Sequence, residues 1–320
     1  MKFIHFLYCP WTGLGLYNGF RGNYWLKNRI QIFKQFVVPS LQNQTCKDFT
    51  LWCSWRREER HNPYVKALVI YLKENAGFKA VHTYHGNCFY DDKYPYAEAR
   101  NRLVSSLHDS IGELLDTIGE VDYVYFTIQP SDDCYCAKAV EGIQKILRET
   151  DLQAVGFSRG FVMNYLTGEV AEYNPTTNPP FYTIKFPRDV FCDPLKHVDF
   201  TSLKKDVGQY KVGTPCPSHE YVGDCLNYGR INERGFIVGC HGTNISTFFN
   251  NPFKGNKVDK EVLKYFGLYD IPVLKIKISI RGKLFQRFPY RIQRKLRYLA
   301  GEKKWLLRPI FNSFYNWIRS

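Results

Sequence analysis

Residues 121–133 have the sequence VDYVYFTIQPSDD. Its almost unbroken run of Val, Tyr and Phe predicts a buried β-strand, which leads into a turn with two adjacent carboxylates, Asp132 and Asp133. In α/β proteins, ligands bind beyond the carboxyl ends of parallel strands, and acids placed there can hold a divalent metal against a phosphorylated substrate. An alternative is that Ser131 and Asp132 only cap a following helix, because both residue types favour that position.

Strand and helix patterns alternate on both sides of this segment. Upstream, strands are expected at 2–9, 49–55 and 80–84, and helices at 26–37, 63–75 and 96–118. Pro39 is expected to end or kink the first helix. Residues 136–147 predict a further helix, and short strands are expected at 154–158, 161–166, 170–173 and 235–240. This alternation predicts an α/β fold, with a mostly parallel sheet and helices on both faces.

The positive charge of the chain is concentrated near its C-terminus. The 320 residues carry a formal net charge of +14. Residues 271–320 hold 13 Lys and Arg against one acid, which leaves 31 basic and 29 acidic side chains in residues 1–270. A nucleic-acid enzyme would more often spread its positive charge along a groove. The composition therefore argues against a nucleic-acid partner and favours an anionic membrane surface.

The chain therefore divides into a body, residues 1–270, and a basic amphipathic segment, residues 271–320. Within that segment, apolar residues recur at helical spacing among arginines and lysines, as in helices that lie in a membrane interface. The alternative is two ordinary helices packed on the body with a basic outer face. Ten scattered cysteines, no secretory signal and no long apolar stretch lead us to expect a cytoplasmic protein, peripheral at the inner membrane face.

Four features are candidates for one site. The acid pair Asp132 and Asp133 is the first, and Arg29 with Trp25 on the first helix is the second. The others are Arg100 with Asn101, near the start of the long helix, and His241, directly after a strand. Each has a structural alternative: an ion pair of Arg100 with Glu98 or Asp92, a core position for Trp25, and a satisfied buried histidine for His241.

In its order of motifs, the chain resembles glycosyltransferases of the A-type (GT-A) fold and, more narrowly, the rhamnosyltransferase family. The matching residues are Arg29, Phe33, Phe36, Pro39-Ser40-Leu41, Gln44-Thr45, Asp48-Phe49-Thr50, Thr127, Ser131-Asp132-Asp133 and His241-Gly242-Thr243-Asn244-Ile245-Ser246. They cover roughly residues 2–250. The resemblance implies a GT-A-like, Rossmann-like body that transfers a sugar, rhamnose in that family, from a nucleotide-sugar donor to a glycan or lipid-linked acceptor.

The expected chemistry gives each candidate residue a role. A departing nucleoside diphosphate gains negative charge, which a divalent metal can neutralise. Mn²⁺ or Mg²⁺ would be held by Asp132, Asp133 and His241, since Mn²⁺ tolerates one imidazole among oxygen ligands. The donor would be bound by a set that follows from the motifs: Trp25, Arg29, Arg100, Asn101, Ser131 and Asp132.

An inverting transfer also needs a base for the acceptor hydroxyl. Glu220 is the first candidate and His219 the second, although both also fit a solvated loop. The chain departs from the family pattern at Ile128 and Pro130, where the family has Arg and the first Asp of its acidic motif. This departure motivates an alternative, a catalytically inactive GT-A module that binds carbohydrate or acts as a scaffold. A basic nucleic-acid-binding protein is the second alternative.

Overall fold

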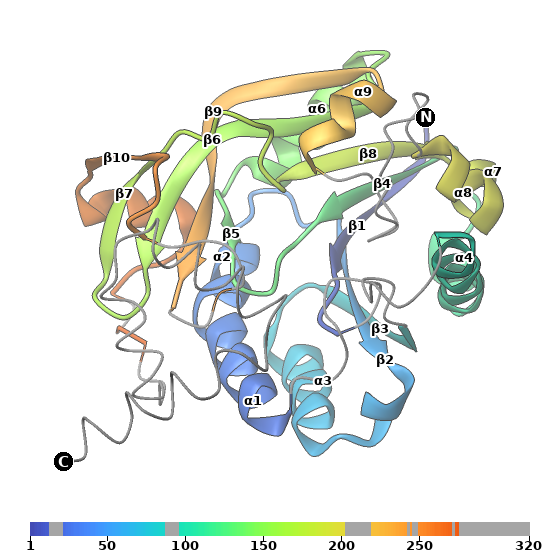
Figure 1. Ribbon diagram of the computed structural model, residues 1–320, viewed down its shortest axis with the longest axis horizontal. Coiled ribbons are helices and arrows are strands. Elements are labelled where there is room, and N and C mark those ends of the chain that lie inside the picture. The colour runs from blue at the N-terminus through green and yellow to red at the C-terminus, as the bar shows by residue number, and fades with distance from the viewer. Residues whose placement is uncertain are drawn as a thin grey trace.

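The computed structural model describes residues 1–12, 22–86, 96–201, 219–241, 244, 249–270 and 273–274. Their strands form one curled ten-stranded sheet (Figure 1). The strands are β1 Phe3–Cys9, β2 Thr50–Arg56, β3 Lys79–Gly86, β4 Tyr123–Ile128, β5 Cys134–Tyr135, β6 Ala154–Asn164, β7 Glu169–Tyr173, β8 Tyr182–Pro187, β9 Tyr228–Cys240 and β10 Lys254–Lys257.

Helices cover the sheet and connect its strands. The longer ones are α1 Asn23–Ile32, α3 Pro63–Asn75, α4 Tyr96–Gly112 and α6 Ala139–Glu149. The shorter ones are η1 Phe33–Val37, α2 Val38–Gln42, η2 Arg57–His61, α5 Leu115–Ile118, α7 Arg188–Phe191, α8 Pro194–Phe200, η3 His219–Tyr221, α9 Val222–Cys225 and η4 Lys260–Phe266. The predicted α/β fold class is confirmed by this arrangement.

One half of the sheet is parallel, in the order β3-β2-β1-β4. The chain passes from β1 to β2 on one side and later returns to add β4 on the other side of β1. In open α/β sheets, ligands usually bind where the winding reverses, at the carboxyl ends of the strands, here β1 and β4. The turn after β4 carries Asp132 and Asp133, so the acid pair lies at this edge of the sheet.

The other half is largely antiparallel. β8 pairs antiparallel with β4 and with β6, and β7 and β10 extend the sheet by further antiparallel pairs. β9 runs parallel to β6 and also pairs antiparallel with β5. The tight connection between β6 and β7 permits only antiparallel pairing there, because parallel neighbours need a long crossover. Parallel pairing is thus less widespread than expected.

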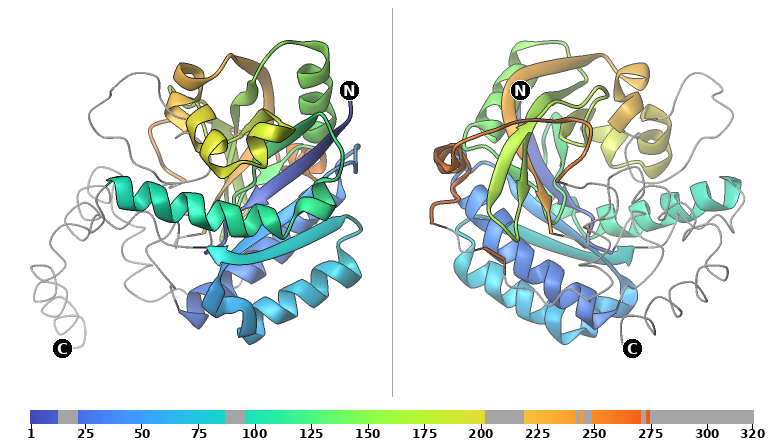
Figure 2. Two further views of the ribbon diagram at one scale, coloured as in Figure 1. Left: turned by 90° about the vertical axis from the view of Figure 1, so that its right-hand side faces the viewer. Right: turned by 60° about the vertical axis from the view of Figure 1, so that its left-hand side comes forward.

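Helices pack on both faces of the parallel strands, as predicted. Because side chains alternate along a strand, Phe6 and Tyr8 of β1 face a core shared with α4, α7 and α8, whereas Leu7 and Cys9 face α1 and α3. Figures 1 and 2 show α4 on one side of the parallel strands and α1 and α3 on the other. The sheet therefore lies between two apolar layers, and its carboxyl edge is left for polar side chains.

The first helix does not end at Pro39. The π-helical turn η1 follows α1, and Pro39 then lies in the first turn of α2. Proline lacks the N–H that an α-helix would use and clashes with the carbonyl four residues earlier. A wider π-turn just before it accommodates the ring without breaking the helical rod. Arg29 and Asn43 consequently lie at different points of one continuous rod.

Element boundaries differ from expectation mainly beyond residue 150. The strands expected at 154–158 and 161–166 form the single strand β6, and β9 begins seven residues before the predicted 235. β8 and the helices α7 and α8 were not predicted. Their sequences are short and irregular, so long-range pairing with β4 and β6 decides their conformation.

A buried polar network joins β1, β4, β8 and α6. His5 lies 2.7 Å from Thr127 through Nε2, and Gln144 donates to His5 Nδ1 over 3.2 Å. Thr127 in turn shares a short hydrogen bond with Thr183. The amide donor at Nδ1 places the ring proton on Nε2, so His5 is neutral. Burial lowers the pKa of His5 to about 3.

The predicted membrane-binding segment, residues 271–320, lies outside the described residues except for Val273 and Leu274. Leu274 is buried against the body, and its N–H donates to the Tyr165 carbonyl over 2.7 Å. In the part of the chain that the structure describes, no helix is long and apolar enough to span a bilayer.

Candidate functional site

Three side chains that are distant in sequence meet at the carboxyl end of β4. Asp132 lies in the turn after β4, Arg29 on α1 and His241 directly after β9. Arg29 forms a close ion pair with Asp132 Oδ2, and His241 Nε2 lies 3.1 Å from the same oxygen. Asn244 also donates to Asp132 Oδ2, over 3.3 Å. Asp132 is therefore the acceptor at the centre of this group, called here the Asp132 cluster.

The cluster is buried, and its charges control one another. The side chains of Arg29 and His241 are 2 % and 0 % exposed, whereas Asp132 retains 14 %. Burial alone would raise the pKa of Asp132, but Arg29 and His241 outweigh it and hold that pKa well below its ordinary range. Burial lowers the pKa of His241, so the ring is neutral and donates from Nε2. Asp132 thus carries a full negative charge at neutral pH.

Asp133 turns away from this cluster toward β9. Its Oδ1 accepts the Gly239 N–H over 2.9 Å, and the residue is 7 % exposed. Burial first, and then the charge of Asp132, raises the pKa of Asp133 well above its ordinary value. Asp133 therefore links the turn to β9 and does not share the ion pair of its neighbour.

The backbone around Asp132 is held by a close approach of β9. Tyr165 donates its hydroxyl to the Asp132 carbonyl over 2.9 Å, and the Phe36 ring stacks on Tyr165 with centroids 3.7 Å apart. A Cβ at Gly239 would collide with both the Asp132 carbonyl and the Tyr165 ring. Only glycine lets β9 pass this close, which brings His241 within reach of Asp132.

The helix-cap alternative for Ser131 and Asp132 does not hold. β5 follows the turn directly, and the next helix, α6, begins only at Ala139. Ser131 is buried at 5 % exposure within the turn. The amide of Gln129 instead donates to the carbonyls of Pro130 and Asp133, each over 2.9 Å, and so fixes the turn from inside.

Of the three residues predicted to bind a metal, Asp132 and His241 meet, whereas Asp133 faces the Gly239 N–H, so the three do not form a metal cage. Among the described residues, no group of three or more His, Cys, Asp and Glu side chains could hold an ion. Asp133 faces a backbone N–H, and His241 uses Nε2 as a donor to Asp132. Magnesium sites on phosphorylated substrates commonly use one or two carboxylates together with substrate phosphates. The partly exposed Asp132 fits that type of site, in which the ion binds with the diphosphate.

The other residues predicted to bind the sugar-nucleotide donor do not all lie at the Asp132 cluster. Trp25 lies beside the cluster, with the Arg29 guanidinium carbon 5.4 Å from its ring centroid. Arg100 forms a 2.7 Å ion pair with Asp199 of α8, whereas Glu98 pairs with Arg102 and Asp92 lies outside the described residues. Asn101 is exposed on α4. The local expectation for Arg100 missed Asp199 because α8 was not predicted.

The predicted bases lie on η3, which packs near α9. Glu220 is exposed. His219 is partly buried, and its Nδ1 makes a short contact with the backbone carbonyl of Asn178. Gly242, Thr243, Ile245 and Ser246, which belong to the late motif, lie outside the described residues.

Sequence reasoning missed several residues at the same sheet edge. Thr12, just after β1, donates to the buried carboxylate of Glu59, which follows β2 on η2. Burial raises the pKa of Glu59. Their positions immediately after predicted strands were the available signal, since carboxyl ends of parallel strands share one edge. Tyr165 and Gly239 had no local signal, because their role depends on contacts with residues distant in sequence.

Known proteins resemble this chain only at low sequence identity. No protein-family model matches the sequence, and no curated protein matches it. Among solved structures, the chain is similar to S. aureus TarS 1–349, with a TM-score of 0.38, 10 % identity, and 75 % of this chain and 60 % of that chain covered. The structure of TarS 1–349 in complex with UDP-GlcNAc is similar with a TM-score of 0.37 and 9 % identity. That match covers 75 % of this chain and 58 % of that chain.

A nucleotide-diphospho-sugar transferase from Desulfovibrio desulfuricans G20 is also similar, with a TM-score of 0.30 and 12 % identity. The match covers 72 % of this chain and 80 % of that one. For TarS 1–349, the chain spans less than two thirds of the matched protein. All these similarities are weak, with TM-scores of 0.38 or less.

Proposed function

We propose that this protein is a glycosyltransferase that moves a sugar from a nucleotide-sugar donor to a glycan or lipid-linked acceptor. The observation that supports it most is the Asp132 cluster, a buried, charged aspartate with an arginine and a neutral histidine at the carboxyl end of β4. Charged groups fixed in a site with little water interact strongly with a developing charge. Transfer from a nucleoside diphosphate produces such a charge on the leaving group.

In this proposal, Arg29 binds the diphosphate and Asp132 orients Arg29 and His241. Burial keeps His241 neutral near pH 7, and the single N–H of the ring is on Nε2, which donates to Asp132. Mn²⁺ or Mg²⁺, when bound with the donor at Asp132, would neutralise charge on the leaving diphosphate. Trp25 offers an aromatic face beside Arg29 for the nucleotide.

Glu220, or His219 as second candidate, is proposed as the base that takes the proton of the acceptor hydroxyl. Rhamnose is proposed as the transferred sugar only because the sequence resembles that family. An inactive module with the same fold is the competing function, motivated by Ile128 and Pro130 in place of the family residues. Donor hydrolysis separates the two, because an inactive module would bind donor without cleaving it.

The central test is a thermal-shift screen of sugar nucleotides. We expect at least one UDP-, GDP- or dTDP-sugar to raise the melting temperature, because a ligand that binds only the native state stabilises it by mass action. A further rise with Mn²⁺ present is expected if the ion binds with the diphosphate at Asp132. His241→Ala should reduce the shift. No shift with any sugar nucleotide, with or without Mn²⁺, would sink the proposal.

The membrane partner is proposed from the 13 basic residues among residues 271–320. Each Lys or Arg near an anionic surface contributes on the order of 1 kcal/mol. A chain truncated after Ser279 should therefore lose co-sedimentation with phosphatidylserine vesicles while retaining donor hydrolysis. Neutral vesicles are the control. Equal vesicle binding by the truncated and full chains would remove the membrane role, and an insoluble truncated chain would favour helices packed on the body.

A further inference from the structure

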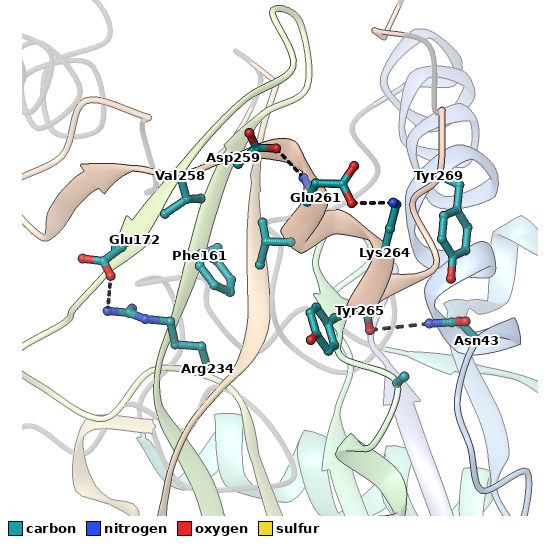
Figure 3. Close-up of a pocket in the computed structure, with 12 residues that line it drawn as sticks. Asn43, Phe161, Glu172, Arg234, Val258, Asp259, Glu261, Lys264, Tyr265 and Tyr269 are labelled. Carbon is teal, nitrogen blue, oxygen red and sulfur yellow. Dashed lines mark hydrogen bonds and ion pairs between the residues drawn. The ribbon is translucent and has the colours of Figure 1, made fainter.

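A concave site lies away from the Asp132 cluster. It is a cavity of about 870 Å³ between the β6–β7–β9 part of the sheet, the end of α2 and η4 (Figure 3). This volume is within the ~300–1,000 Å³ of typical small-molecule sites. Arg29 and Asn43 lie on one helical rod, 14 residues apart, so the cavity is roughly 20 Å along that rod from the cluster. The cavity is therefore a separate site.

Aromatic rings line one side of the cavity. Tyr265 and Tyr269 are 70 % and 57 % exposed, and Phe161 lies at the base with 8 % exposure. Figure 3 shows Phe161 between these tyrosines and the opposite wall, which carries Arg234 and Glu172. Tyrosines this exposed contribute little to the core of the body. Their ring faces remain available to a ligand, which can pack its C–H groups on them.

The opposite wall carries a fixed pair of polar groups. Arg234 of β9 binds Glu172 of β7 over 2.9 Å, and the two side chains are 23 % and 29 % exposed. The Arg234 guanidinium carbon lies 5.5 Å from the Phe161 ring centroid, and Arg234 also donates to the Gly160 carbonyl over 2.8 Å. These contacts hold the planar guanidinium group of Arg234 in one orientation. The wall thus presents hydrogen-bond donors and acceptors side by side.

The described residues that line the cavity carry nearly balanced charge. They include three carboxylates, of Glu172, Asp259 and Glu261, and two cations, of Arg234 and Lys264. A polyanion such as nucleic acid or a phosphorylated chain would meet net negative charge there and be repelled. A purely apolar ligand would leave the polar wall without partners. A neutral molecule with both C–H faces and many hydroxyl groups matches both walls.

We propose that this cavity binds a neutral glycan chain. One sugar ring would pack on Tyr265 or Tyr269, and hydroxyl groups of the chain would form hydrogen bonds with the Arg234–Glu172 pair. The proposal does not depend on catalysis at Asp132. If the protein is a glycosyltransferase, the site would hold the acceptor or product chain at a distance from the reacting end.

The test uses the full chain on a microarray of neutral oligosaccharides, followed by titration calorimetry with the best-binding glycan. We expect a neutral glycan to bind, and Tyr265→Ala and Tyr269→Ala each to weaken it by about tenfold. Tyr24→Ala is the matched control, because Tyr24 on α1 is as exposed as Tyr269, at 57 %. Arg234→Met with Glu172→Gln should also weaken binding. Donor hydrolysis should be unchanged in both tyrosine variants.

Three results would overturn the site. The first is that no neutral glycan binds the full chain. The second is that a glycan binds both tyrosine variants as tightly as the Tyr24→Ala control. The third is that Asp132→Asn, and neither tyrosine variant, loses the glycan, which would place it at the Asp132 cluster. If the native chain binds a neutral glycan but hydrolyses no sugar nucleotide, the result counts against the proposed function and leaves the glycan site standing.

Discussion

The Asp132→Asn variant should lose about 10³-fold in kcat/KM for sugar transfer or donor hydrolysis, because the charge that fixes Arg29 and His241 is gone. Breaking a buried ion pair also costs about 3–5 kcal/mol of stability, since the buried Arg29 loses the compensating charge of Asp132. The measurements are donor turnover for activity, and circular dichroism with urea unfolding for the folded state.

Asp116→Asn is the matched control, since Asp116 is an exposed acid on α5. It should keep the turnover of the native chain. If Asp132→Asn does not fold at the assay temperature, Asp132→Glu keeps the charge and moves the oxygen, and a loss of at least tenfold is expected. Turnover within twofold of the native chain in a folded Asp132 variant would show that the cluster is structural.

Acid should destabilise the protein through His5. The folded state keeps His5 neutral with a pKa of about 3, while the unfolded chain takes up a proton near pH 6.5. The stabilisation from His5 is therefore complete above about pH 6.5 and is lost as the pH falls toward about 3. Between about pH 7 and pH 4 the loss should be on the order of 3 kcal/mol. Urea unfolding at the two pH values measures it.

His5→Gln should remove most of this difference, because glutamine can donate to Thr127 and accept from Gln144 without titrating. His61→Gln is the control, since His61 is exposed on η2. His241 acts in the same direction, whereas Asp133, whose pKa is raised, acts in the opposite one, and both contributions remain in the His5→Gln variant. Asp132 adds a loss only at more acidic pH, since its pKa is lowered. An unchanged pH dependence in His5→Gln would assign the acid effect to other groups.

The strand at β4 and the acid pair after it could be predicted because both follow from local pattern. Apolar residues over six positions predict a buried strand, and the carboxyl end of a parallel strand is a ligand edge whatever its neighbours. The helices α1, α3, α4 and α6 could be predicted for the same reason, because their apolar residues recur at helical spacing. The partner of Arg100 was not, because it lies 99 residues away on a helix with no clear periodicity.

By itself, the sequence determined the α/β class, the place of Asp132 and Asp133 at a strand end, and the basic character of residues 271–320. Only the tertiary structure decided that Asp132 and Asp133 have different environments, one facing Arg29 and His241 and the other the Gly239 N–H. The physical reason is that a local pattern fixes which way a strand buries its side chains. The charge state of adjacent carboxylates depends on burial and on partners more than 100 residues away.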